Sequence, residues 1–168
     1  MVPDDFTGYF AATATAAGAL IGLLFVAASL RPETLLGRAA PPAARAILGS
    51  AFTALVNAFF VSLIALIPHT GIGYTATIMA LISLWSTLRL HRDVPRHDHA
   101  VLQLTLAMVA YLGQLGVGVA SIFSPETSGY VDALAYLLIA SFAVALRRAW
   151  SLLQGRHLPA DQGTQPDA

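Results

Sequence analysis

The chain has 168 residues, of which 57% are hydrophobic and only 11% are charged, and its formal net charge at pH 7 is zero. A soluble globular chain carries about 25% charged residues, so this composition indicates a protein that lies in lipid. The absence of cysteine excludes disulfides and thiolate metal sites, and the neutral charge argues against a nucleic-acid partner.

Long runs without charge predict the elements of the fold. A helix needs about 20 apolar residues to cross a hydrocarbon core of ~30 Å. The first uncharged run is 6–30, and the second, 46–88, is long enough for two spans that the turn at 68–71 separates. A further run is 100–125. The last, 133–146, is short enough to be interfacial or re-entrant instead of spanning.

The placement of arginine decides how the last run is interpreted. All nine cationic side chains are arginine, and positive residues accumulate in short cytoplasmic loops. If the last run spans, all nine arginines fall on one side. The sequence therefore predicts an all-α integral membrane helical bundle of five transmembrane helices, with the N-terminus outside and the C-terminus inside. The predicted helices are 7–30, 46–67, 72–90, 100–123 and 129–149, in a transmembrane domain of residues 1–150 followed by a disordered cytoplasmic tail, 151–168.

Two further features bear on location. Heavy use of alanine, together with arginine in place of lysine, is typical of a GC-rich bacterial genome, so we expect the cytoplasmic (inner) membrane of a bacterium. The acidic start, MVPDD, lacks the basic region of a signal peptide, so the first helix is expected to be retained as an anchor.

Small residues recur at helical spacing in several of the predicted spans. Helices associate in lipid through close van der Waals contact and interhelical hydrogen bonds, both of which small residues favour. In the first helix Ala11, Ala14, Gly18 and Gly22 share one face, and GALIG at 18–22 matches GxxxG. An alanine-rich composition also produces such stripes by chance. Comparable stripes are Ala54, Ala58, Ser62 and Ala65; Gly73, Ala76, Ala80 and Ser83; and Ala107, Tyr111, Gln114, Gly118 and Ser121.

A polar layer is predicted near mid-membrane, at the level of Gly18 and Gly22. It consists of Asn57, Gln114 and Tyr136. An amide left unsatisfied in hydrocarbon costs several kcal/mol, so Asn57 and Gln114 are each expected to find a partner, most simply each other. Three arrangements remain open: a clamp within one chain, a contact across a subunit interface, or a polar ring that lines a pore.

One predicted inner loop is rich in potential ligands. Residues 91–99 contain three histidines and two aspartates, so His91, His97 and His99 are weak candidates for binding zinc or a similar ion. Their spacing matches no known ligand pattern and two arginines lie among them, so we expect no metal and no cofactor. Asp98 is instead expected to cap the next helix.

Signatures of catalysis are otherwise missing from the sequence. It contains no HExxH, GxSxG, P-loop or GxGxxG motif, and no carboxylate pair lies within a predicted span. Charged groups buried in spans mark ion-coupled sites, and none lies deeper than Asp132, Arg89 or Arg147. Both features disfavour an enzyme and a proton-coupled transporter.

The segments AGALIGLLFVAASL and RAILGSAFTALVNAFFVSLIALIP carry a resemblance. They resemble small multi-pass membrane proteins of actinobacterial type, over about residues 9–75. Members of this group are sometimes named modulators of a membrane-bound AAA protease. The resemblance implies a five-span membrane protein of unassigned function, and the protease-modulator name implies a protein partner. It supplies no catalytic residue.

These features favour a non-enzymatic bacterial inner-membrane protein that works through helix–helix contacts. Its partners would be the lipid bilayer and either itself, as a homo-oligomer, or another membrane protein to which it is an accessory subunit. The alternative is a small oligomeric channel or permeation unit in which Asn57 or Gln114 faces a wet path. A third hypothesis is an enzyme that acts on a lipid headgroup through the loop at 91–99.

Overall fold

The computed structural model describes residues 4–30, 32–35, 37, 40–68, 71–92, 98–124 and 129–153, apart from the side chains of 4, 34, 98–101, 103 and 151–153. Every regular element in these ranges is helical, which confirms the predicted all-α class. The elements are η1 (Asp4–Phe6), α1 (Thr7–Leu30), α2 (Pro32–Leu35), α3 (Pro42–Ala65), α4 (Ile72–His91), α5 (Asp98–Phe123) and α6 (Gly129–Leu153). Most of the predicted tail, residues 154–168, lies outside the described residues.

The five long helices fall where the uncharged runs predict them. Two differences concern helix ends. Helix α3, predicted at 46–67, starts at Pro42 and not at residue 46. Proline suits the first turn of a helix, because its missing N–H would have no partner there. The last helix continues to Leu153, so residues 151–153 are helical and not part of the tail. The short helix α2 was not predicted.

Four of the long helices are apolar and long enough to cross a membrane: α1, α3, residues 104–123 of α5 and residues 129–150 of α6. The shortest uncharged run, 133–146, thus lies in a helix that is long and apolar enough to cross a membrane. Helix α4 has 20 residues but is not among the four, because Arg89, together with several threonine and serine residues, reduces its hydropathy. Of the five predicted spans, the α4 segment is therefore the one that is not confirmed.

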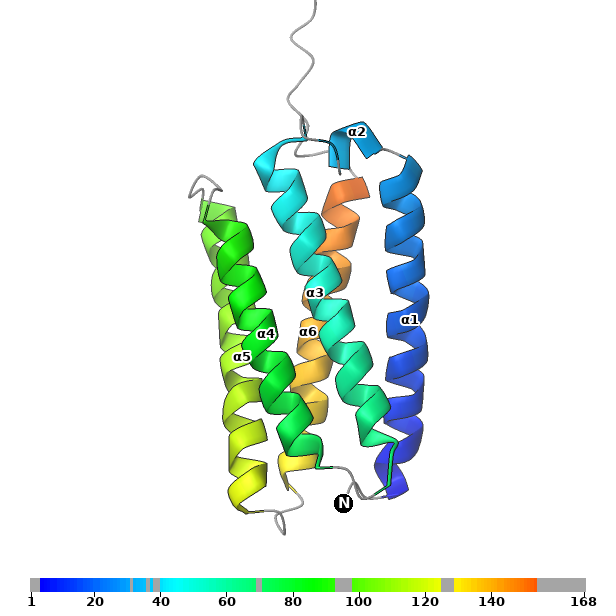
Figure 1. Cartoon of the computed structure of the whole chain (residues 1–168), viewed down its shortest axis with the longest axis vertical. Coiled ribbons are helices and arrows are strands. Elements are labelled where there is room, and N and C mark those ends of the chain that lie inside the picture. Colours follow the sequence, from blue (N-terminus) through cyan, green and yellow to red (C-terminus); the bar gives the residue numbers. More distant parts are fainter. Residues whose placement is uncertain are drawn as a thin grey trace, which may run out of the picture.

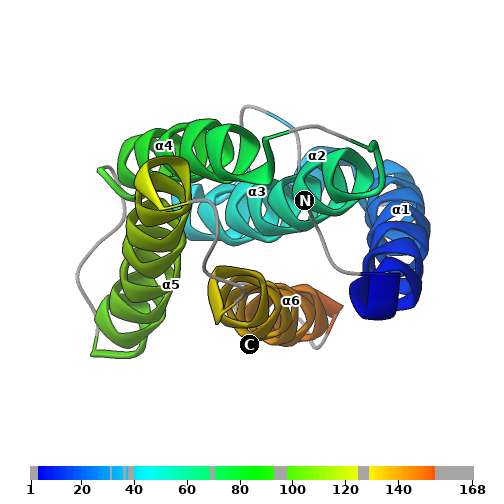
Figure 2. The same cartoon turned by 90° about the horizontal axis from the view of Figure 1, so that it is seen from below.

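Four of the helices form a closed ring. Contacts join α3 to α4, α4 to α5, α5 to α6 and α6 to α3, so that each of these helices lines a common interior. Figure 2 shows this ring along the helix axes, with α1 outside it against α3. The Tyr9 hydroxyl on α1 also donates a hydrogen bond of 2.9 Å to the carbonyl oxygen of Ala135 in α6.

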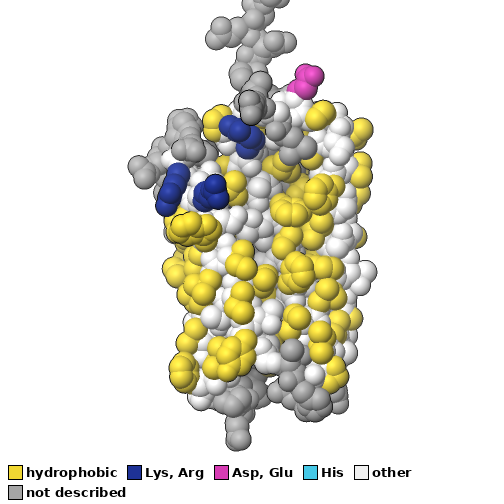
Figure 3. Space-filling view, in the orientation of Figure 1, with side chains coloured by type: hydrophobic (Ala, Val, Ile, Leu, Met, Phe, Trp, Pro, Cys, Tyr) yellow, Lys and Arg dark blue, Asp and Glu magenta, His cyan; other side chains and the backbone are white. Residues whose placement is uncertain are grey.

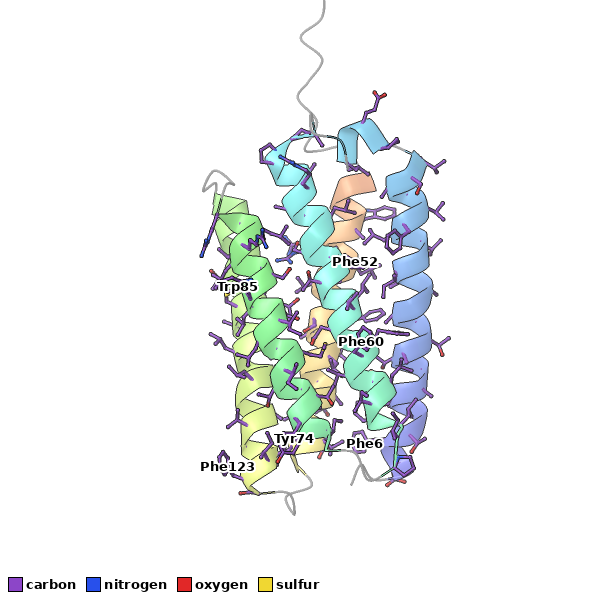
Figure 4. The ribbon with its side chains drawn as sticks, in the orientation of Figure 1. Phe6, Phe52, Phe60, Tyr74, Trp85 and Phe123 are labelled. Atoms are coloured by element: carbon purple, nitrogen blue, oxygen red, sulfur yellow. The ribbon has the colours of Figure 1, made fainter. Side chains whose placement is uncertain are left out.

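The described arginines gather at one end of the bundle, which we call the arginine end. It is formed by the first turns of α3 and the last turns of α4 and α6, at the top of Figure 1. Figure 3 shows arginine side chains only near this end, above a band of exposed hydrophobic side chains. Figure 4 shows Tyr74 and Phe123 near the opposite end and Trp85 closer to the arginine end.

Three of the predicted small-residue stripes face other helices. The stripe of α3 and the stripe of α4 are fully buried, and that of α5 is buried except for Ser121, which is half-buried. The stripes meet at the contact of α4 with α5. A Cβ atom at Gly118 would lie 2.9 Å from the backbone nitrogen of Thr77 and 3.1 Å from the carbonyl oxygen of Gly73. Only glycine permits this approach of the two backbones.

The stripe predicted for α1 is only partly buried: Ala14 and Gly18 lie toward α3, whereas Ala11 and Gly22 do not. The buried residues of α1 are Phe10, Ala14, Ala17, Leu24 and Ala28. They repeat at alternating steps of three and four residues, with the half-buried Ile21 filling the gap, which is the seam of a helix packed nearly parallel to its neighbour. Ala11 and Gly22 are exposed instead, because they lie on other faces of the helix.

Candidate functional site: the polar interior of the ring

Asn57 of α3 and Gln114 of α5 form a reciprocal pair inside the ring. The Asn57 amide nitrogen donates to the Gln114 side-chain oxygen at 2.8 Å, and the Gln114 amide nitrogen donates to the Asn57 oxygen at 2.9 Å. The two side chains are 1% and 0% exposed. The predicted pairing of these two amides is therefore confirmed.

The same pair also ties in a third helix. The Gln114 amide nitrogen donates a second hydrogen bond, of 3.1 Å, to the carbonyl oxygen of Ala76 in α4. Both hydrogens of that amide are thus used, and α3, α4 and α5 are joined at one level. Of the three arrangements left open by the sequence, the structure contains the clamp within one chain.

Tyr136, which was predicted for the same polar layer, lies elsewhere. It is 73% exposed and faces away from the ring. The buried face of α6 contains Leu134 and Leu138, and a residue midway between them points to the opposite side because successive residues turn by about 100°. Tyr136 is therefore not part of the polar interior that Asn57 and Gln114 form.

Tyr111 was predicted on the packing face of α5, and it is buried there. One turn of α5 nearer the arginine end than Gln114, it lies within electrostatic reach of the Arg148 guanidinium in α6. The half-buried ring of His91 in α4 is also within reach of that guanidinium. Side chains from α4, α5 and α6 therefore converge on the interior near the arginine end.

Arg148 is the polar residue that the sequence reasoning missed. Its side chain is 2% exposed and is the largest fully buried one among the described residues. A signal was present in the sequence, since Leu138, Ser141, Ala145 and Arg148 recur at steps of three and four residues and so share one face of α6. The neighbouring Arg147 is exposed.

Buried hydroxyl groups accompany Arg148 in this part of the ring. The hydroxyls of Thr87 in α4 and Ser141 in α6 are buried and have no hydrogen-bond partner. The Thr87 carbonyl oxygen is 3.0 Å from Nδ1 of His91. Nearer the lipid, the hydroxyls of Thr53 in α3 and Ser86 in α4 lie 3.1 Å apart. The described interior therefore contains buried hydroxyl groups that no protein atom satisfies.

The candidate metal ligands are only partly described. The His91 ring contacts the Thr87 carbonyl oxygen, while His97 and the side chain of His99 lie outside the described residues. No group of three histidine, cysteine or acidic side chains that could hold a metal ion occurs in the described ranges. Helix α5 begins at Asp98, but the Asp98 side chain, which was predicted to cap it, lies outside the part of the chain that the structure describes.

The two glycines of the GALIG motif have different surroundings. A Cβ atom at Gly18 would lie 3.4 Å from the ring of Phe59 in α3, whereas one at Gly22 would meet nothing within 4 Å. Gly22 belongs to a second seam, with steps of four and three residues, that runs along the exposed side of α1. We call it the outer seam of α1; it consists of Gly8, Ala12, Thr15, Ala19, Gly22, Val26 and Ser29.

The outer seam differs from the exposed faces of the other helices. The exposed face of α4, for example, consists of Tyr74, Ile78, Leu81, Ile82, Trp85 and Leu88. Large side chains of this kind suit contact with lipid, whereas a seam that is glycine, alanine, serine or threonine at every position except Val26 suits contact with another helix. The outer seam is therefore a second candidate site, on the surface.

No protein family, curated protein or solved structure matches the chain.

Proposed function

We propose that the chain is an inner-membrane protein of a bacterium that crosses the bilayer five times and acts through helix–helix contacts. In this proposal α4 is the fifth span, the amino end lies outside and the arginine end faces the cytoplasm. Two observations support this topology: α4 is as long as a span and packs between α3 and α5, and the described arginines gather at one end of the bundle.

The outer seam of α1 is the observation that carries the proposed role. Helix α1 has one seam packed against α3 and a second seam, mostly of small residues, that none of the described residues covers. Because lipid tails are as apolar as leucine, an exposed helix gains nothing from small residues unless another backbone approaches it. The second seam would bind a helix of another subunit.

The partner is either a second copy of the chain or another membrane protein. The resemblance to proteins named as modulators of a membrane-bound AAA protease makes such a protease one candidate for the second case. The closed polar pair favours these roles over a pore within one chain, since Asn57 and Gln114 satisfy each other and leave no amide facing a path.

Cross-linking at single cysteines tests this role, because the natural chain has no cysteine. In native membranes under mild oxidation, Gly22→Cys is expected to give a disulfide-linked dimer if the partner is a second copy. If the partner is another protein, a membrane-permeant photo-cross-linker attached to the same thiol is expected to capture it. Affinity purification should then give one adduct of constant mass.

Two matched positions serve as controls. Gly18→Cys lies on the same helix but against Phe59, and Gly116→Cys lies on the exposed face of α5 with open space around it. Neither is expected to give an adduct. Equal yields at Gly22 and Gly116, or no adduct of either kind at Gly22, would show that the outer seam faces lipid alone.

A further inference from the structure

The interior of the ring is polar toward the arginine end and apolar toward the other end. Thr87, Ser83, Ser50 and Arg148 are buried in the half near the arginine end. The opposite half contains the apolar cluster of Val61, Ala76, Val131, Leu134 and Leu138. The Asn57–Gln114 pair lies between the two, with Gln114 near the middle of the candidate span 104–123.

Buried polar groups of this kind are normally satisfied by protein atoms or by ordered water. The hydroxyls of Thr87 and Ser141 have no protein partner. The buried Arg148 of α6 lies toward the arginine end of the same interior, and burying a charge is costly unless hydrogen bonds satisfy it. Tyr111 adds a hydroxyl close to the Arg148 guanidinium.

A water molecule inside a protein needs two to four polar partners. Thr87 of α4, Tyr111 of α5 and Ser141 of α6 supply that many buried hydroxyl groups to the ring interior, from three different helices. The opposite half does not contain that many: its buried Ser62 hydroxyl is a single polar group beside the apolar cluster, and the Thr77 hydroxyl is pressed against Gly118 at the α4–α5 contact.

We propose that ordered water occupies the ring interior between Arg148 and the Asn57–Gln114 pair, and that it enters from the arginine end. We call this region the inner vestibule. The amide pair closes it, and the apolar cluster keeps water out of the opposite half. The bundle thus contains a hydrated site that is open at one end, which is independent of any docking at the outer seam of α1.

Water-edited solid-state NMR of the full chain in lipid vesicles tests this proposal. Magnetisation that starts on water reaches side chains quickly only where water lies beside them. With threonine, serine and valine labelled, transfer to Thr87 and Ser141 is expected to be several-fold faster than transfer to Val61 and Val131, which are equally buried in the opposite half.

The variant Thr87→Val identifies the NMR signal of Thr87, because that signal disappears, and it removes a polar group from the inner vestibule. It replaces the hydroxyl with a methyl group of the same shape, so water transfer to Ser141 is expected to fall while transfer to Val61 stays the same. Transfer to Thr87 and Ser141 as slow as to Val61 would overturn the inner vestibule. Fast transfer to Val61 and Val131 as well would overturn its closure by the Asn57–Gln114 pair.

Discussion

Gly73 of α4 and Gly118 of α5 pack backbone to backbone, and a Cβ atom on Gly73 would lie 2.9 Å from the carbonyl oxygen of Gly118. This contact fixes how closely α4 approaches α5. It also explains how α4, the one long helix that is not a candidate span, is held in the ring: its face of small residues packs at Gly118, and its large side chains point outward.

The first prediction concerns this contact. Gly118→Ala is expected to destabilise the protein by roughly 1–3 kcal/mol, because the added carbon would meet the backbone of Thr77 and force the helices apart. Thermal unfolding in detergent, followed by size-exclusion chromatography, measures the change. Gly116→Ala, two residues away with open space around it, is the control and is expected to leave the unfolding temperature unchanged.

The second prediction concerns the amide pair. Asn57→Leu is expected to lower stability by about 1 kcal/mol, because the Gln114 side-chain oxygen loses the donor that Asn57 supplies inside the bundle. A double-mutant cycle with Gln114→Leu measures the coupling. The double variant should lose less than the sum of the two single variants, and strictly additive losses would mean that the two amides do not stabilise each other.

The third prediction compares two neighbouring arginines. Arg148→Ala is expected to destabilise the bundle by about 2 kcal/mol or more, because it removes the largest buried side chain and leaves a cavity. Arg147→Ala changes an exposed side chain and is expected to have little effect. Chemical unfolding in mixed micelles gives both values. Equal effects of the two substitutions would contradict the buried position of Arg148.

The fourth prediction concerns the outer seam of α1. Gly22→Leu is expected to reduce the mass of the complex in native nanodiscs, or to release a copurifying protein. The reason is that a large side chain holds the backbone of α1 away from the helix of the other subunit. The unfolding temperature of the separated chain should stay the same, since Gly22 contacts nothing within 4 Å. Gly116→Leu on α5 is the matched control, and an identical mass for Gly22→Leu and the natural chain would count against the seam.

The fifth prediction concerns topology and the role of α4. With five spans, a green fluorescent protein fused after Ala168 should fluoresce, because it folds in the cytoplasm, and alkaline phosphatase inserted between Pro68 and Gly71 should be active outside. If α4 does not cross, the two ends of the transmembrane domain lie on the same side. An active phosphatase fused after Ala168, together with a green fluorescent protein fusion at the same position that does not fluoresce, would rule out the proposed orientation.

Much of the architecture follows from composition along the chain. Uncharged runs gave the long helices within a few residues, because a helix in lipid must satisfy its own backbone groups and cannot carry many charges. The stripes of α3, α4 and α5 were also predictable. Each combines small residues with a polar group such as Gln114, and a polar group in hydrocarbon has a strong reason to face its partner.

Helix α1 shows what the sequence left undecided. It has two seams at steps of three and four residues, on opposite sides, and both contain small residues. Nothing within one helix indicates which seam its neighbour covers. Packing against α3 decided the matter, because Phe10 and Leu24 bury more apolar surface there than the glycines and alanines of the other seam would.

Arg148 is a second residue for which the sequence determined the position along the helix and the tertiary structure determined the surroundings of the side chain. The sequence by itself determined that this arginine lies in the last turns of a helix, at the end where the other arginines gather. Only the tertiary structure decided that its side chain turns inward, since α6 presents to the ring the face that carries Leu138, Ser141 and Arg148, and Tyr111 of α5 lies opposite. The local pattern sets the helix and its ends, whereas the surroundings of each face depend on neighbours that are distant in sequence.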